Sequence, residues 1–69
     1  MDIKKFGNDV AYCRKKIGFS QQDLATATSL HVRTISNIEN GKNVNLVSLI
    51  RVVDFLDIFL SYEIRTNKV

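Results

Sequence analysis

Four side chains in the segment 32–37 could read the edges of DNA bases: Val32, Arg33, Ser36 and Asn37. An arginine can donate two hydrogen bonds to guanine, an asparagine pairs with adenine, a serine donates or accepts, and an aliphatic group contacts the thymine methyl. If the segment is helical, all four lie on the side opposite Ile35 and Ile38. The same pattern also suits an ordinary solvent-facing helix surface, so composition alone leaves both interpretations open.

The sequence offers little for catalysis or metal binding. Cys13 and His31 are the single cysteine and the single histidine, and so the one candidate pair of nucleophile and base. Cys13 falls on an apolar stripe and His31 on a turn, so we expect a buried, inert thiol. His31 has no companion ligands for a metal, and the chain has no glycine-rich phosphate loop. We therefore expect no enzyme activity, no metal and no cofactor.

Length and composition predict a single small domain over residues 1–69. The 69 residues are 45% hydrophobic and 25% charged, with a net charge of +3. No apolar run approaches the roughly 20 residues of a membrane-spanning helix, so no membrane partner is expected. One cysteine cannot form an internal disulfide, which favours a cytoplasmic location. The modest basic excess suits a nucleic-acid partner, but many unrelated small proteins share it.

Two helices are predicted before residue 30. The first follows an apolar stripe with spacings of three and four residues, formed by Ile3, Phe6, Val10, Cys13 and Ile17. Asp2 can cap its start and Gly18 can end it, whereas Gly7 weakens it slightly. The second helix, at about 21–28, follows Ser20, which can form a capping box with Asp23.

A third helix is predicted at about 32–40 and a fourth after Asn45. Two short helices joined by a tight turn at about 20–40 form a helix-turn-helix, with Ala25 at their close crossing. Asn45 can cap the fourth helix. The side chains expected on the buried side of that helix are Leu46, Leu49, Ile50, Val53 and Leu56, with Arg51 and Asp54 outside.

The C-terminal residues alternate in a different pattern, which predicts a short strand at about 58–64. One face of this strand would consist of Ile58, Leu60, Tyr62 and Ile64. A lone strand cannot satisfy its own backbone groups, and the chain offers no second strand. A second copy of the chain is the simplest partner, so the strand is expected to form a homodimer.

Residues 14–41, RKKIGFSQQDLATATSLHVRTISNIENG, carry a motif that covers both helices of the predicted pair. The pattern is R-x-x-x-G-x-[ST]-Q-x-[DE]-L-A followed by V-x-x-x-I-S-x-[IL]-E-N-G. It resembles the Cro/repressor (XRE) family of helix-turn-helix domains, and with the fourth helix the resemblance covers about residues 3–57. The resemblance implies an all-α, compact, phage-repressor-like four-helix domain, to which we add the short C-terminal β-strand.

The resemblance also implies a function and a set of contacts. The family implies a sequence-specific regulator of transcription that binds double-stranded DNA, usually as a homodimer on a palindromic operator; a repressor is the form we favour. Matching positions assign base reading to Val32, Arg33, Ser36 and Asn37, and phosphate contacts to Gln21, Asn40 and Lys42. Arg14 and Glu39 match a pair that ties the first helix to the end of the third; two independent surface charges are the alternative.

The chain departs from the family pattern at the turn, where Ser29 replaces the usual glycine. A left-handed serine costs about 1–2 kcal/mol, which leaves a reshaped turn open. The expected C-terminal strand is similar to those of HipB-like antitoxins, so an antitoxin that binds a toxin protein as well as DNA is one alternative function. A protein-interaction module that keeps the fold is another.

Overall fold

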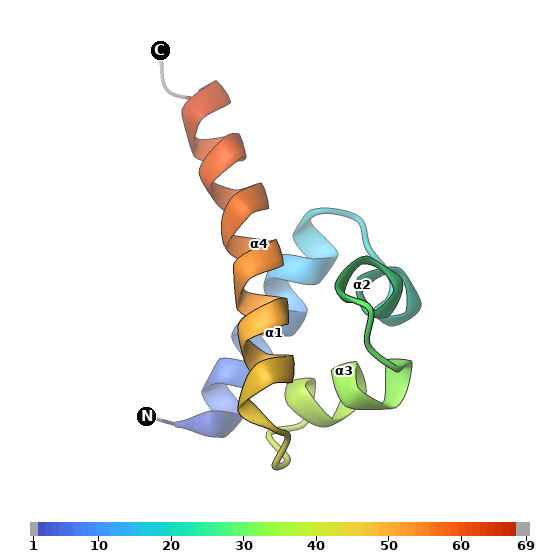
Figure 1. Ribbon diagram of the computed structural model, residues 1–69. Helices are drawn as coiled ribbons and strands as arrows, with labels where there is room; N and C mark the ends of the chain where they lie inside the picture. The colour runs from blue at the N-terminus through green and yellow to red at the C-terminus, as the bar shows by residue number, and fades with distance from the viewer. Residues whose placement is uncertain (1, 68–69) are drawn as a thin grey trace.

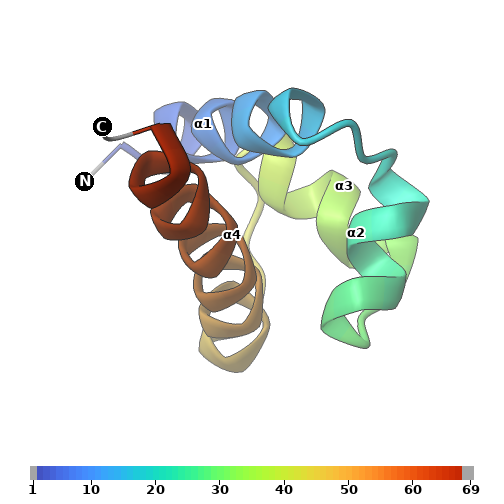
Figure 2. The ribbon, with the colours of Figure 1, turned by 90° about the horizontal axis from the view of Figure 1, so that it is seen from above.

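The computed structural model describes the backbone of residues 2–67 and the side chains of residues 2–57. Four helices follow one another along the chain: α1 (Ile3–Lys16), α2 (Gln21–Thr28), α3 (Val32–Glu39) and α4 (Leu46–Asn67). Figure 1 shows the C-terminal half of α4 rising beyond the other helices. From above, α1 runs along one edge of the molecule, with α4 on one side, α2 on the other and α3 between them (Figure 2). The prediction of an all-α helix-turn-helix fold is confirmed.

The capping residues predicted from the sequence begin the helices as expected. Asp2 accepts hydrogen bonds from the backbone amides of Lys4 and Lys5. At α2, the amide of Asp23 donates to the Ser20 hydroxyl, and the amide of Ser20 donates to the Asp23 carboxylate, each over 2.9 Å. These two bonds complete the predicted capping box, and the backbone bond from Ser20 is the main cause that lowers the pKa of Asp23.

The core is formed by apolar side chains from all four helices. Leu24, Ala25 and Ile35 are fully buried, and α2 packs directly against α3. The other buried apolar side chains among residues 2–57 are Val10, Ile38, Val52 and Leu56. The rings of Phe19 and Phe55 pack at the edge of this cluster with their centroids 5.7 Å apart. The core therefore fixes α2 and α3 as one unit.

The turn between α2 and α3 keeps its left-handed residue despite the absence of glycine. Ser29 adopts φ 58° and ψ 38°, and the amide of Leu30 donates to the carbonyl of Ala25 over 2.9 Å. The guanidinium of Arg51 on α4 lies 3.5 Å from the carbonyl oxygen of Ser29. The turn is thus not reshaped, and the serine bears the backbone strain of this conformation.

The buried face of α4 differs from the one predicted. Leu56 is buried, but Leu46, Ile50 and Val53 are 69%, 49% and 41% exposed. Val52 and Ser48, which were not expected in the core, are buried instead. The helix is apolar on more than one side, so its spacing fits several orientations, and contacts with α1 and α2 select the one observed.

The predicted strand is also corrected, because α4 continues through residues 58–64 as a helix. The side chains expected to form its dimer face, Ile58, Leu60, Tyr62 and Ile64, lie outside those that the structure describes. A helix satisfies its own backbone hydrogen bonds, whereas a lone strand would leave them unpaired. The four-residue spacing of Leu56, Leu60 and Ile64 is equally compatible with helix, so the short alternation was misleading.

Gly7 has a role that the sequence did not indicate. A Cβ at this position would overlap the carbonyl oxygen of Ile38 and lie 2.8 Å from that of Glu39, both at the end of α3. Gly7 itself is buried in the middle of α1. The glycine therefore weakens the helix locally but lets the backbones of α1 and α3 approach closely.

Candidate nucleic-acid interface

One side of α3 is open to solvent while the other is fixed in the core. Val32 and Arg33 are exposed, and Ser36 and Asn37 are half-buried. Ile35 and Ile38 hold the opposite side and are almost completely buried. Because successive helix residues are about 100° apart, the four candidate base-reading residues occupy one continuous arc. The structure thus brings these four predicted side chains together on one face.

The start of α3 lies beside an open hollow of about 480 Å³, lined by His31, Val32, Arg33 and Thr34. His31 occupies the N-cap position, but its side chain makes no capping hydrogen bond. The first amides of a helix lack partners within the helix and carry partial positive charge. Arg33 forms no ion pair with any side chain that the structure describes. This end of α3 therefore offers positive charge and free donors to an anionic partner.

The segment after α3 places two further candidates next to its exposed face. Asn40 and Lys42 are exposed, and the Asn40 amide nitrogen lies 3.3 Å from the Ser36 hydroxyl. Gly41 has φ 72°, and the amide of Lys42 donates to the carbonyl of Asn37 over 2.9 Å. This left-handed ending fixes the backbone that carries the Lys42 ammonium.

Gln21, at the first position of α2, makes a contact that the sequence did not predict. Its side-chain nitrogen donates to Oε1 of Glu39 over 3.0 Å. This bond joins the start of α2 to the end of α3 across 18 positions of the sequence. An amide nitrogen carries two hydrogens, so this bond leaves a second donor on a side chain whose orientation is already fixed.

Glu39 also binds Arg14, and the two form a buried pair. The distance from Arg14 Nε to Glu39 Oε2 is 2.6 Å, and that from Nη2 to Oε1 is 3.1 Å. The third guanidinium nitrogen donates to the carbonyl of Phe19 over 2.7 Å. The two side chains are 9% and 7% exposed. The pair that the family resemblance implied is therefore present, and it ties α1, the loop after it and α3 together.

Burial and hydrogen bonding act on the carboxylate of Glu39 in opposite directions. Burial raises its pKa, but the hydrogen bonds from Arg14 and Gln21 and the positive charge of Arg14 together lower it below its ordinary value. The hydrogen bond to Glu39 likewise raises the pKa of Arg14. Both groups therefore stay charged, and Gln21 faces a permanent anion on one side.

The chain is similar to known helix-turn-helix proteins in both sequence and structure. The helix-turn-helix family matches residues 10–62, most of the chain. The chain belongs to the Cro/repressor (XRE) helix-turn-helix family. Among solved structures four chains match, and one is the restriction-modification controller protein C.AhdI from Aeromonas hydrophila. It shares 33% identity, covers 81% of this chain and 86% of its own, and superimposes with a TM-score of 0.73. No curated protein matches the chain.

The family makes this helix-turn-helix chain a DNA-binding regulator of transcription. In the part of the chain that is described, no helix is long and apolar enough to cross a membrane. No group of three or more potential metal-binding side chains occurs among the described residues either. Cys13, the lone cysteine, is half-buried rather than fully buried as expected, and it lines a pocket with Val53 and Leu56 of α4.

Proposed function

We propose that this helix-turn-helix chain is a repressor that binds a palindromic operator as a homodimer, with α3 in the major groove. The observation that supports this most is the arc of polar side chains on α3, whose opposite face is buried against α2. A rigidly held helix can present base-reading groups in a fixed register, as helix-turn-helix proteins require. The likeness to a restriction-modification controller also favours a regulatory role.

The side chains on this arc divide into two kinds of contact. Arg33 would donate to guanine, Asn37 would pair with adenine, and Val32 would contact a thymine methyl, with Ser36 beside them. Gln21, Asn40 and Lys42 lie near the end of α3 and would hold the phosphate backbone, which sets the register without choosing the sequence. The second donor of Gln21, steered by Glu39, suits such a phosphate oxygen.

A homodimer follows from the small size of this reader. One α3 contacts only a few base pairs, and linking two readers raises the affinity without new kinds of contact. Two copies related by a two-fold axis would place their α3 helices roughly 34 Å apart, one turn of DNA. Such a dimer would recognise a palindrome.

Replacing Arg33 by alanine tests base reading. We expect a loss of about 1–3 kcal/mol on the preferred site, together with relaxed preference at one base position. Titrating a selected duplex and a scrambled duplex with the unchanged protein and with Arg33→Ala measures the affinity loss and the base preference. Equal losses on both duplexes would make Arg33 a phosphate contact. Failure of the unchanged protein to prefer any duplex would instead favour a protein-interaction module.

Replacing Lys42 by alanine tests phosphate binding. The lysine would release about one counterion on binding, so the variant should lower the salt slope by about one unit and keep the same site preference. Binding isotherms at several salt concentrations measure the slope. Lys16→Ala, on the last turn of α1, is a control with the same loss of charge. An identical slope for the unchanged protein and Lys42→Ala would rule out this contact.

A further inference from the structure

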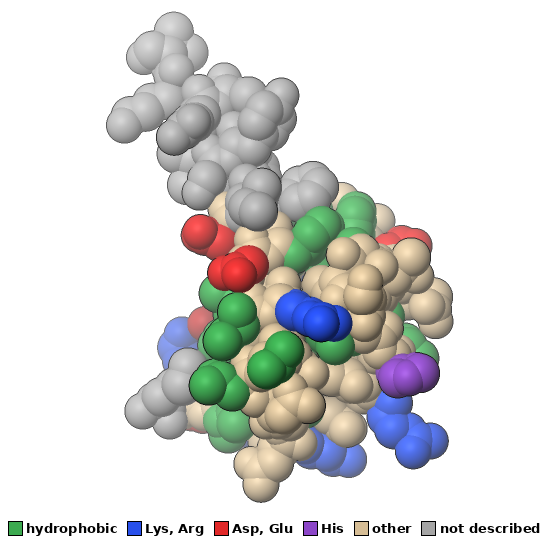
Figure 3. Space-filling view, in the orientation of Figure 1, with side chains coloured by type: hydrophobic (Ala, Val, Ile, Leu, Met, Phe, Trp, Pro, Cys, Tyr) green, Lys and Arg blue, Asp and Glu red, His purple; other side chains and the backbone are tan. Residues whose placement is uncertain are grey.

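Exposed apolar side chains are concentrated on one side of the protein. Seven large apolar residues with described side chains are exposed, and four of them line one pocket between α1 and α4. These four are Ile3 on α1 and Leu46, Ile50 and Val53 on α4. Figure 3 shows hydrophobic side chains gathered over the lower part of α4. Contiguous apolar surface of this kind marks an interaction site, whereas single exposed residues need no explanation.

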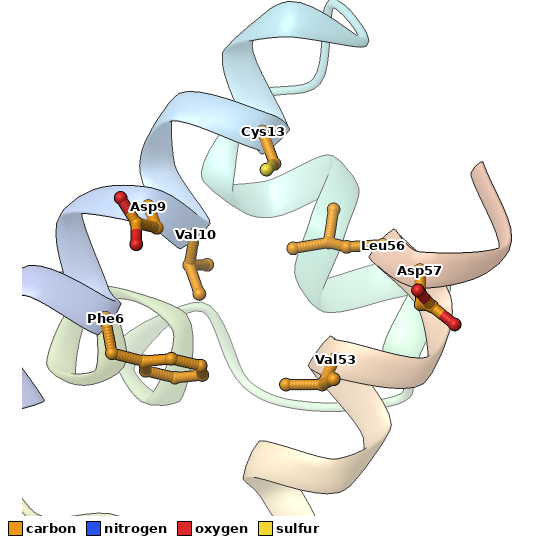
Figure 4. A pocket seen from close by; sticks show the side chains of 7 residues that line it. All are labelled: Phe6, Asp9, Val10, Cys13, Val53, Leu56 and Asp57. Atoms are coloured by element: carbon orange, nitrogen blue, oxygen red, sulfur yellow. The ribbon is translucent and has the colours of Figure 1, made fainter. Parts of the chain in front are cut away.

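A groove follows this surface between α1 and α4. Its first section, about 300 Å³, is lined by Ile3, Phe6, Leu46, Leu49, Ile50, Val53 and Asp54. A second section of about 170 Å³ shares Phe6 and Val53 with the first. Figure 4 shows Val10 and Leu56 pointing into this second section, with Asp9 and Asp57 at its sides. The groove is therefore apolar along its floor and acidic at one end.

The exposed residues of α4 are spaced for contact with another helix. Leu46, Ile50 and Val53 stand at positions i, i+4 and i+7 and form one stripe, here named the α4 stripe. Residues with this spacing share one helix face, and burying it requires a second amphipathic helix. The other side of α4 already packs on the core through Val52 and Leu56. The α4 stripe thus lacks a partner within the described part of the chain.

Charges at the two ends of the groove indicate which helix would fit. Lys4 and Lys5 stand on the first turn of α1, beside Ile3 at one end. Asp54 and Asp57 stand at the other end, two to three turns along α4 from Leu46. Lys5 is also 3.4 Å from Asp9, an exposed pair that solvent screens. The best complement is a surface of the same shape with its charges in the reverse order.

We propose that the occupant of this groove is the α4 stripe of a second copy, running antiparallel around a two-fold axis near Ile50. A two-fold contact uses the same patch on both copies, so every interaction occurs twice. The antiparallel order brings Asp54 and Asp57 of each copy toward the lysine end of the other. This inference rests on the homodimer of the proposed function and adds where, and in which orientation, the copies meet.

This interface leaves the DNA-binding side free. The α4 stripe begins only a few residues after α3 ends at Glu39. None of the base-reading candidates lines the groove. The two α3 helices would therefore flank the two-fold axis, each with its polar arc uncovered, as a palindromic operator requires.

Ile50→Asp tests the interface directly. The variant places two unpaired carboxylates at the two-fold axis, so the dissociation constant of the dimer should rise at least about 100-fold. Tyr12→Asp is the matched control, since Tyr12 is 65% exposed on α1 and lines neither section of the groove. Sedimentation equilibrium measures the dissociation constant of the dimer for both variants, and circular dichroism checks that both are folded. A folded Ile50→Asp variant that dimerises as tightly as Tyr12→Asp would overturn the proposal.

Charge reversal tests the orientation. Asp54→Lys with Asp57→Lys should weaken the dimer, and adding Lys4→Glu with Lys5→Glu should restore it, because the opposite charges then meet again. If the two α4 helices ran parallel, the acidic ends of the two copies would lie together and so would the lysine ends. Adding Lys4→Glu with Lys5→Glu would then not restore the affinity of the dimer. Lack of restoration would therefore overturn the antiparallel order.

DNA binding separates this inference from the proposed function. Ile50→Asp should bind a single half-site duplex as tightly as the unchanged protein does. On the full palindrome it should bind more weakly than the unchanged protein, because it no longer binds as a dimer. If the unchanged protein is still monomeric at a concentration 100-fold above its dissociation constant for the operator, the proposed interface is overturned. Base reading by α3 would not be affected by that result. A protein that dimerises through Ile50 but prefers no duplex would overturn the proposed function alone.

Discussion

Gly7→Ala should destabilise this protein by about 2 kcal/mol, although alanine is the better helix former. In an exposed helix the exchange gains up to about 1 kcal/mol. Here the added methyl group overlaps the carbonyl oxygen of Ile38 and crowds that of Glu39, and both atoms belong to backbone that cannot rotate away. Overpacking of this kind costs about 1–3 kcal/mol or more. Moving α1 away from α3 would also disturb the Arg14–Glu39 pair.

Thermal and urea unfolding at one fixed protein concentration measure this effect. A loss of about 2 kcal/mol corresponds to a fall in Tm of roughly 8–16 °C for a domain of this size. Asn8→Ala is the control, because Asn8 is the next residue of α1 and is exposed. It should be neutral or slightly stabilising. A Gly7→Ala protein as stable as Asn8→Ala would show that α1 and α3 do not approach closely.

Arg14→Met should cost about 3–5 kcal/mol, the largest effect expected from a single substitution here. Methionine keeps most of the volume of the arginine stem but leaves the Glu39 carboxylate buried without its cation. The carbonyl of Phe19 loses its donor as well. Removing one partner of a buried pair lowers the stability by much more than the intact pair contributes to it, because the other charge remains desolvated.

The double variant Arg14→Met with Glu39→Met distinguishes this reason from simple loss of packing. With both charges gone no ion is left unpaired, so the double variant should be more stable than Arg14→Met alone. Urea unfolding of the two single variants and the double variant provides the cycle. Additive losses would mean that the two side chains act independently, against the 2.6 Å contact.

Stability should also fall in acid, and Glu39 should be one of the causes. Its pKa is lower in the folded protein than in the unfolded chain, so its contribution is complete above the unfolded value, about 4.3. The contribution is lost as the pH falls from about 5 through the folded pKa, because the unfolded chain binds the proton first. Glu39→Gln should flatten this dependence, and unfolding curves between pH 3 and 7 measure it. Asp23, whose pKa is also lowered, would retain part of the slope.

Local features of the fold could be predicted from the sequence. Asp2, Ser20 and Asn45 were expected to cap helices, and each accepts a hydrogen bond from a backbone amide two or three residues later. Such caps depend on neighbours in the chain, so residue type and spacing suffice to identify them. The buried positions of Ile35 and Ile38 followed from helix periodicity in the same way.

The tertiary structure alone decided the features that depend on distant partners. Spacing fits α4 in several orientations, and only packing against α1 and α2 turns Val52 inward and Leu46 and Ile50 outward. The alternation at residues 58–64 predicted a strand, but a strand needs a neighbour to pair with, and the helix satisfies its backbone without one.

The candidate site shows the same division. The sequence, through its family resemblance, indicated which side chains could face DNA and that Arg14 meets Glu39. It did not indicate that Gln21 bonds to that glutamate or that Gly7 admits the end of α3, because both contacts join residues 18 or more positions apart. Periodicity records which side of a helix is apolar, whereas only the folded chain determines what that side touches.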